Sequence, residues 1–69
     1  MSGIISRLRL ITRPLSAPEL AEMLGVHKVT VYKLARRGVI PSYRIASAVR
    51  FDAVAVASWL SGSEKAATR

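Results

Sequence analysis

The 69-residue chain contains no cysteine, one histidine and four acidic residues. Without cysteine it can form neither a disulfide framework nor a thiolate metal site. One histidine and so few carboxylates cannot build the usual zinc or calcium cage. The sequence also lacks a paired acid or a nucleophile–base set of the kind that carries catalysis. We therefore expect a protein that is not an enzyme and that binds no metal or other cofactor.

Long apolar runs are missing as well. Arg50 and Asp52 interrupt the one region that could be considered for a membrane span, and such a span needs about 18 or more apolar residues. The N-terminal apolar stretch contains Arg7, Arg9 and Arg13, so it does not resemble a signal peptide. We expect a cytoplasmic protein.

The abundant feature is positive charge. Eleven basic residues against four acidic ones give a formal net charge of +7. Between residues 23 and 51 there are six lysines and arginines and no acid, whereas a surface that needs only solubility usually mixes both signs. Such a field indicates a polyanionic partner or an anionic membrane surface.

Residues 1–13 carry a mixed signal. Leu8 and Leu10 alternate with arginines as in a strand, whereas Ile4, Leu8 and Ile11 fit the stripe of a helix. A proline follows this segment and ends whichever element precedes it. We favour an extended N-terminal arm or an edge strand over 1–13.

The first clear helix is predicted over 17–24. Ser16 and Glu19 have the spacing of a capping box, and Leu15 and Leu20 have the spacing of a hydrophobic staple. Its apolar stripe consists of Ala17, Leu20, Ala21 and Leu24.

A second helix is predicted over 28–37, after a turn that contains Gly25. Gly38 and Pro41 end it, and His27 precedes it as either a cap or a phosphate contact. The residues expected to fill the wedge between the two helices are Leu20, Leu24, Val26, Val31 and Leu34. The opposite face of the second helix carries Val29, Tyr32, Lys33 and Arg36.

A small β-hairpin is predicted next, around a turn at 46–48. Apolar and basic residues alternate on both sides of this turn, with Tyr43, Ile45, Val49 and Phe51 inside and Arg44 and Arg50 outside. Tyr43 and Phe51 are expected in the core.

Asp52 is the expected cap of a third helix over 53–61, and residues 62–69 are predicted to form a flexible tail. The buried stripe of this third helix is expected to contain Ala53, Val56, Trp59 and Leu60. Val54 and Ala57 would then stay exposed, either as a tolerated apolar surface or as a contact surface for another protomer or a partner protein.

These elements predict a mainly α fold with a small β-hairpin wing, a winged helix-turn-helix over 14–61. The stretch from Leu15 to Leu60 resembles the excisionase-type helix-turn-helix family, which is related to the MerR-like winged helices. It carries the capped first helix, the TVYKLARRG helix, the IP stop, the hairpin and the terminal WL. The hairpin departs from the family pattern, because Ala46-Ser47-Ala48-Val49 stands where members often have glycines and an aromatic residue.

The resemblance implies a protein that binds double-stranded DNA with its second helix in the major groove and its wing on the backbone or minor groove. Many members are phage excisionases, also called recombination directionality factors. These bind tandem sites cooperatively, bend the DNA and direct a tyrosine integrase towards excision. Other members are small transcription regulators. Either role implies action at the nucleoid of a bacterial host cell.

The residues themselves support the same use of the second helix. A major groove about 12 Å wide admits one helix, which reads base edges with its outward side chains. Arg36 or Lys33 would donate to guanine and Val29 would contact a thymine methyl group. Tyr32 is either partly buried or a phosphate donor. The predicted DNA-binding set is Lys28, Val29, Thr30, Tyr32, Lys33, Arg36, Arg37, Arg44 and Arg50.

Within this set, Lys28 and Thr30 are better placed for phosphates than for bases. Arg44 and Arg50 would contact phosphates or the minor groove, or else protect an edge strand by their charge. Three functions remain open: an excisionase, a transcription regulator with the same contacts, and a membrane-surface or protein-only adaptor. The adaptor is the weakest of the three, because the sequence lacks the long, strongly amphipathic helix that binding to a membrane surface requires. A chain this short has no room for a ligand-sensing domain, and this favours an excisionase that self-associates on DNA.

Overall fold

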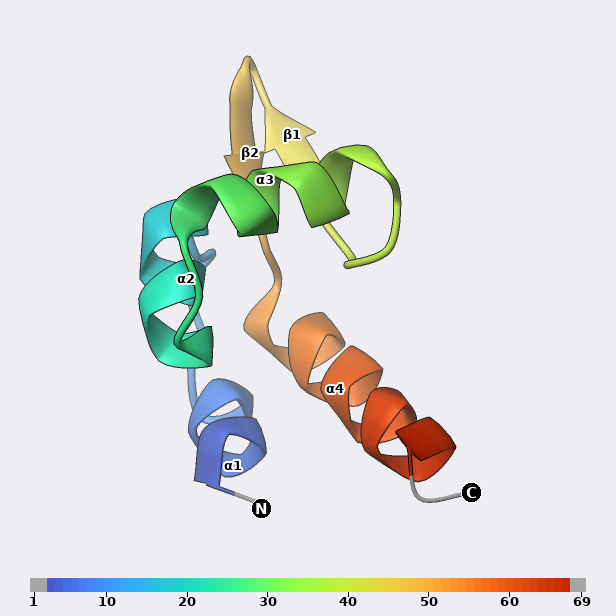
Figure 1. Cartoon of the computed structure of the whole chain (residues 1–69). Coiled ribbons are helices and arrows are strands. Elements are labelled where there is room, and N and C mark those ends of the chain that lie inside the picture. The colour runs from blue at the N-terminus through green and yellow to red at the C-terminus, as the bar shows by residue number, and fades with distance from the viewer. Residues whose placement is uncertain (1–2, 68–69) are drawn as a thin grey trace.

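The computed structural model describes the backbone of residues 3–67 and the side chains of residues 3–62. Four helices and one two-stranded antiparallel sheet form a mainly helical winged helix-turn-helix, as predicted. In chain order the elements are α1 (Gly3–Arg9), α2 (Ala17–Leu24), α3 (Lys28–Arg36), β1 (Tyr43–Ile45), β2 (Ala48–Arg50) and α4 (Ala53–Ala67). The α3 helix and the hairpin occupy one end of the molecule, and α1 and α4 occupy the other (Figure 1).

The start of α2 is fixed by the predicted capping box. The backbone N–H of Glu19 donates to Ser16 Oγ at 3.3 Å, and the backbone N–H of Ser16 donates to Glu19 Oε1 at 3.0 Å. Arg13 Nη1 lies 2.9 Å from Glu19 Oε2 and adds an ion pair at the surface. The helix ends at Gly25, whose φ of +73° is the left-handed conformation that glycine adopts without strain.

The core lies where α1, α2, α3, the end of the hairpin and the first turns of α4 meet. Its buried residues are Ile5, Leu8, Leu15, Ala17, Leu20, Ala21, Val31, Ile40, Phe51, Ala53, Val56 and Ala57. In the wedge between α2 and α3, Leu24 and Leu34 are half-buried. Val26 is exposed, contrary to expectation, because it lies in the turn beyond the end of α2.

A backbone bridge joins the segment before α2 to the segment after β2. The N–H of Leu15 donates to the Phe51 carbonyl, and the N–H of Phe51 donates to the Leu15 carbonyl, both at 2.9 Å. The side chains of both residues are buried. This bridge ties the base of the hairpin to the helix pair.

The extended arm or edge strand expected over 1–13 is wrong for residues 3–9, which form α1. Ile5 and Leu8 are spaced by three, so one face of a helix buries both of them against α4. The strand-like alternation was misleading because Leu10 lies beyond the end of α1 and is 81% exposed. Residues 1–2 lie outside the described part of the chain.

The last helix is longer than predicted. α4 continues to Ala67, so the expected flexible tail over 62–69 is helical through 67, and residues 68–69 lie outside the described part. Ala57, expected to be exposed, is fully buried because α1 packs against α4 and gives it a second covered face. Val54 is 49% exposed, as expected. Trp59 and Leu60 are half-buried rather than in the core.

The hairpin has a shorter turn than predicted, and this changes which side chains share a face. Ile45 pairs with Ala48, so the turn contains two residues, and Arg44 pairs with Val49. Directly opposed residues lie on the same face of an antiparallel pair, and a shift of one residue reverses the faces. The turn begins with Ala46 at φ +56°, a left-handed conformation that favours glycine.

The predicted arrangement, with both arginines outside and Tyr43 in the core, is therefore wrong. Arg44 shares a face with Val49, whereas Arg50 pairs with Tyr43 on the opposite face. Tyr43 is 39% exposed and Ile45 is 57% exposed. Phe51 is fully buried, as predicted, because the bridge to Leu15 holds it at the base of the hairpin.

The packing of α1 predicts that Leu8→Ala lowers the free energy of unfolding by about 2–5 kcal/mol, because it leaves a cavity in the core. Urea unfolding followed by circular dichroism measures the loss. Leu10→Ala is the matched control, since the same truncation is made at an exposed site. Equal stability of the two variants would show that α1 does not belong to the core.

The capping box predicts a pH dependence of stability. The hydrogen bond from the Ser16 backbone N–H, aided by Arg13, holds the pKa of the Glu19 carboxyl below its ordinary value. The carboxylate therefore stabilises the fold above the ordinary glutamate pKa, and this contribution is lost as the pH falls through the lowered pKa. We expect wild type to be more stable than Glu19→Gln at about pH 7 and this difference to shrink at about pH 3. Thermal unfolding at both pH values measures it, and a constant difference would contradict the assignment.

Candidate nucleic-acid interface

The α3 helix presents its N-terminal turn at the surface with a side-chain cap. The backbone N–H of Val29 donates to His27 Nδ1 at 3.1 Å. His27 is therefore the N-cap, one of the two roles that the sequence left open for it. Arg37 is the C-cap of α3, and Gly38 then turns the chain with a φ of +73°.

The two faces of α3 differ as the sequence predicted. Val31 is fully buried against α2, and Leu34 and Ala35 are half-buried beside it. The residues on the opposite face, spaced i, i+3, i+4 and i+7, are all exposed: Val29, Tyr32, Lys33 and Arg36. Tyr32 is thus an outward residue and not a core residue.

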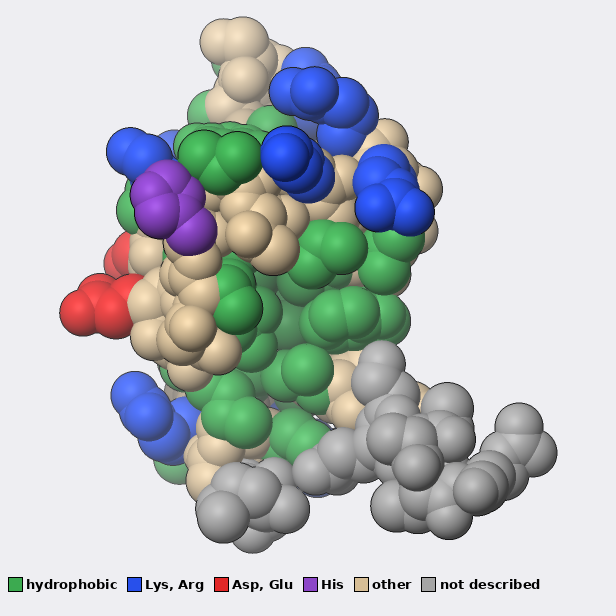
Figure 2. Space-filling model, viewed as in Figure 1, with side chains coloured by type: hydrophobic (Ala, Val, Ile, Leu, Met, Phe, Trp, Pro, Cys, Tyr) green, Lys and Arg blue, Asp and Glu red, His purple; other side chains and the backbone are tan. Residues whose placement is uncertain are grey.

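Basic side chains surround this outward face. Figure 2 shows lysines and arginines gathered at the end of the molecule formed by α3 and the hairpin, with acidic side chains at the edge beside α2. The exposed polar and basic residues on α3, its C-cap and β1 are Lys28, Thr30, Lys33, Arg36, Arg37 and Arg44. The structure brings these six predicted residues to one end of the molecule.

Arg50 is separated from this group by the register of the hairpin. It lies on the face of the hairpin opposite to Arg44. Its Nη1 donates to the Val49 carbonyl at 2.8 Å, and the residue is half-buried. Arg44 therefore faces α3 and Arg50 does not, a distinction that the sequence-based prediction lacked.

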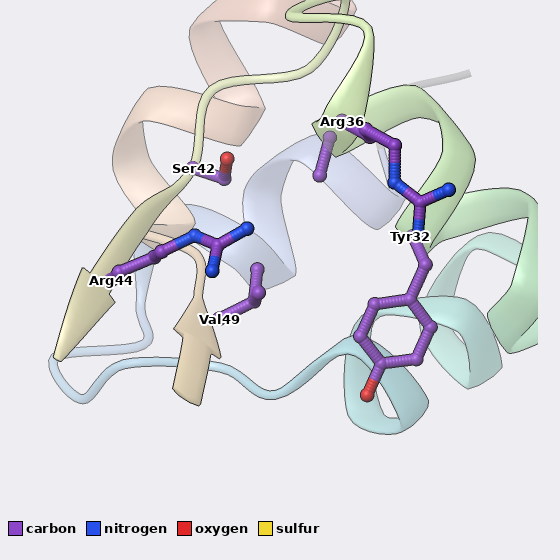
Figure 3. Close-up of a pocket in the computed structure, with 6 residues that line it drawn as sticks. Tyr32, Arg36, Ser42, Arg44 and Val49 are labelled. Carbon is purple, nitrogen blue, oxygen red and sulfur yellow. The ribbon is translucent and has the colours of Figure 1, made fainter. Parts of the chain in front are cut away.

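A hollow lies between the C-terminal half of α3 and the hairpin. Its lining residues are Tyr32, Ala35, Arg36, Ser42, Arg44 and Val49. Figure 3 shows Arg44 reaching from β1 into this space, with Arg36 and Tyr32 across from it on α3. Ser42 was missed by sequence reasoning, because its place depends on how the loop after α3 returns to the helix, and no local pattern reveals this.

The charge in this region has no internal compensation. Neither Arg36 nor Arg44 forms an ion pair within the described residues. Of the three acids with described side chains, Glu19 is held by Ser16 and Arg13, and Asp52 Oδ2 accepts from the backbone N–H of Ala55 at the start of α4. The third, Glu22, is exposed on α2 and forms no ion pair among the described residues. The exposed cations at the α3 end are therefore available to an external anion.

Two further observations concern the described residues only. None of the described helices has the length and apolar character that a membrane crossing requires. Nor do three or more histidine, aspartate or glutamate side chains in this part of the chain gather where they could hold a metal ion.

A family model described as "Helix-turn-helix domain" matches residues 14–63. This match covers more than half of the chain, and the chain belongs to this family of DNA-binding domains, which includes excisionase-like proteins and whose members are typically non-enzymatic. No curated protein and no solved structure matches the chain. The match begins after α1, so the helix that packs on α4 is outside the shared domain.

Proposed function

We propose that this protein binds duplex DNA sequence-specifically, with α3 in the major groove and the hairpin on the adjoining backbone. The observation that carries the proposal is the difference between the two faces of α3. One face is buried against α2, and the other presents exposed side chains with no acid on the helix or the hairpin. Such a helix can enter a groove without displacing any part of its own fold.

The proposal assigns different tasks to the residues of this surface. A recognition helix reads base edges with its outward side chains, which makes Val29 a partner for a thymine methyl group and Lys33 a donor to guanine. Lys28, Thr30 and Arg37 flank the helix and suit phosphates, which receive at least half of the hydrogen bonds in such complexes. Arg50 faces away from α3, and in this proposal it does not contact the DNA directly.

We further propose that the protein acts as a recombination directionality factor that binds tandem sites and bends the DNA for a tyrosine integrase. One helix and one small hairpin cover only about 600–1,000 Å² on DNA, while bending a site costs on the order of 1–6 kcal/mol. Several copies side by side can offset that cost where one copy cannot. The half-exposed Val54 on α4 is the candidate contact with a neighbouring copy or with the integrase.

Binding by this surface predicts a steep salt dependence. If about six phosphates are contacted, affinity falls on the order of a thousandfold between about 50 and 200 mM salt.

Lys33→Gln should reduce discrimination at one base position by about 1–3 kcal/mol, whereas Arg9→Gln on α1 should preserve it. Fluorescence anisotropy with the selected site and single-base variants measures both effects. Salt-independent binding would contradict the proposal.

The recombination role predicts that the purified protein stimulates excision by the cognate tyrosine integrase and suppresses integration. A plasmid recombination assay measures both directions. Val54→Glu should weaken binding to tandem sites while leaving binding to a single site intact. Absence of stimulation by a protein that still binds its site would overturn the recombination role and leave transcription regulation, which uses the same DNA contacts.

A further inference from the structure

The hollow between α3 and the hairpin is bordered by two arginines and a serine, all of which carry hydrogen-bond donors: Arg36, Arg44 and Ser42. Tyr32 also lines it, but its hydroxyl group points away from Arg44 and Ser42 (Figure 3). Ala35 and Val49 supply the apolar part of its lining. A ligand that matches this lining is small, accepts several hydrogen bonds and carries negative charge.

Two guanidinium groups that line one hollow from different elements both attract an anion that enters it. Arg44 is directed towards α3 because the two-residue turn pairs it with Val49 (Figure 3). Arg36 comes from the last residue of α3. No carboxylate among the described residues forms an ion pair with either of them, so both are free to bind an anion from outside the fold.

Phosphate is the anion that this lining fits best. The planar guanidinium group of arginine can make two parallel hydrogen bonds to phosphate oxygens, and two arginines on opposite sides can hold all the free oxygens of a phosphodiester. Both arginines are exposed, so the hollow opens to solvent and a nucleic-acid strand can reach it.

We propose that this hollow binds one backbone phosphate of the DNA strand that borders the groove occupied by α3. This inference rests on the proposed DNA binding and deepens it. The hollow adjoins the C-terminal half of α3, beyond the turns that face base edges, where the sugar–phosphate backbone leaves the groove. Arg36 then positions the helix on the backbone, and base reading is left to Val29 and Lys33.

The test compares Arg36→Gln and Arg44→Gln with Arg9→Gln, a matched change on α1 at the opposite end of the molecule. All three side chains are exposed, and circular dichroism and thermal unfolding verify the fold of each variant. We expect Arg36→Gln and Arg44→Gln each to weaken binding to the selected duplex and to an unrelated duplex by the same factor. Each should also reduce the slope of log affinity against log salt by about 1.

Duplexes that carry one uncharged methylphosphonate at successive backbone positions identify the phosphate. One position should weaken wild type and Arg9→Gln alike, and have little further effect on Arg36→Gln or Arg44→Gln. If Arg36→Gln instead relaxes specificity at a single base pair, Arg36 reads a base and the inference is overturned. It is also overturned if Arg44→Gln leaves both affinity and salt slope unchanged.

Two controls separate this inference from the proposed function. If Lys33→Gln loses base discrimination while both arginine variants bind like wild type, DNA binding stands and the phosphate site fails. If wild type binds no duplex in a salt-dependent way, both fail. A titration with inorganic phosphate tests whether the hollow binds free phosphate instead of a phosphate of DNA. It is carried out without DNA at constant ionic strength and is followed by amide chemical shifts. Strong shifts at residues 42–44, together with no methylphosphonate effect, would assign the hollow to free phosphate.

Discussion

The backbone bridge between Leu15 and Phe51 is the constraint on which the arrangement of this molecule depends. A two-stranded hairpin is barely stable alone, and β1 and β2 have exposed or half-buried side chains along their whole length. The bridge, with both side chains buried in the core, attaches the base of the hairpin to the start of α2. α3 packs on α2 in turn. The position of Arg44 relative to Arg36 therefore depends in part on this pair of backbone hydrogen bonds.

Local signals explain why α2 and α3 could be predicted and α1 could not. Ser16, Glu19 and Gly25 mark the ends of α2 by capping chemistry that acts within a few residues. Residues 3–9 in isolation fit a strand as well as a helix. Their conformation is decided by α4, more than forty positions away in the chain, whose apolar face offers Ile5 and Leu8 a place to pack. Contacts of this kind leave no pattern in a short window of sequence.

The candidate site divides in the same way. The outward face of α3 follows from helical periodicity, because burying Val31 turns Lys33 and Arg36 outward. Which face of the hairpin carries the Arg44 side chain depends on whether the turn has two residues or three. Alternation is equally satisfied by both turn lengths, but the shorter turn reverses the partners and sends Arg44 and Arg50 to opposite faces. The hollow beside Ser42 needs both the loop path and this register, so it emerges only in three dimensions.

The placement of the acidic residues gives the excess positive charge a physical meaning. Glu19 completes the capping box of α2 and Asp52 caps α4, and at both places a negative charge complements the helix N-terminus and stabilises the fold. At α3 the cap is His27, so this helix starts without a carboxylate. An acid there would stabilise the helix more, yet it would repel a phosphate at the end where α3 would meet DNA. Glu19 and Asp52 thus stabilise the starts of α2 and α4, and no acid lies on α3 or the hairpin, where an anionic partner would approach.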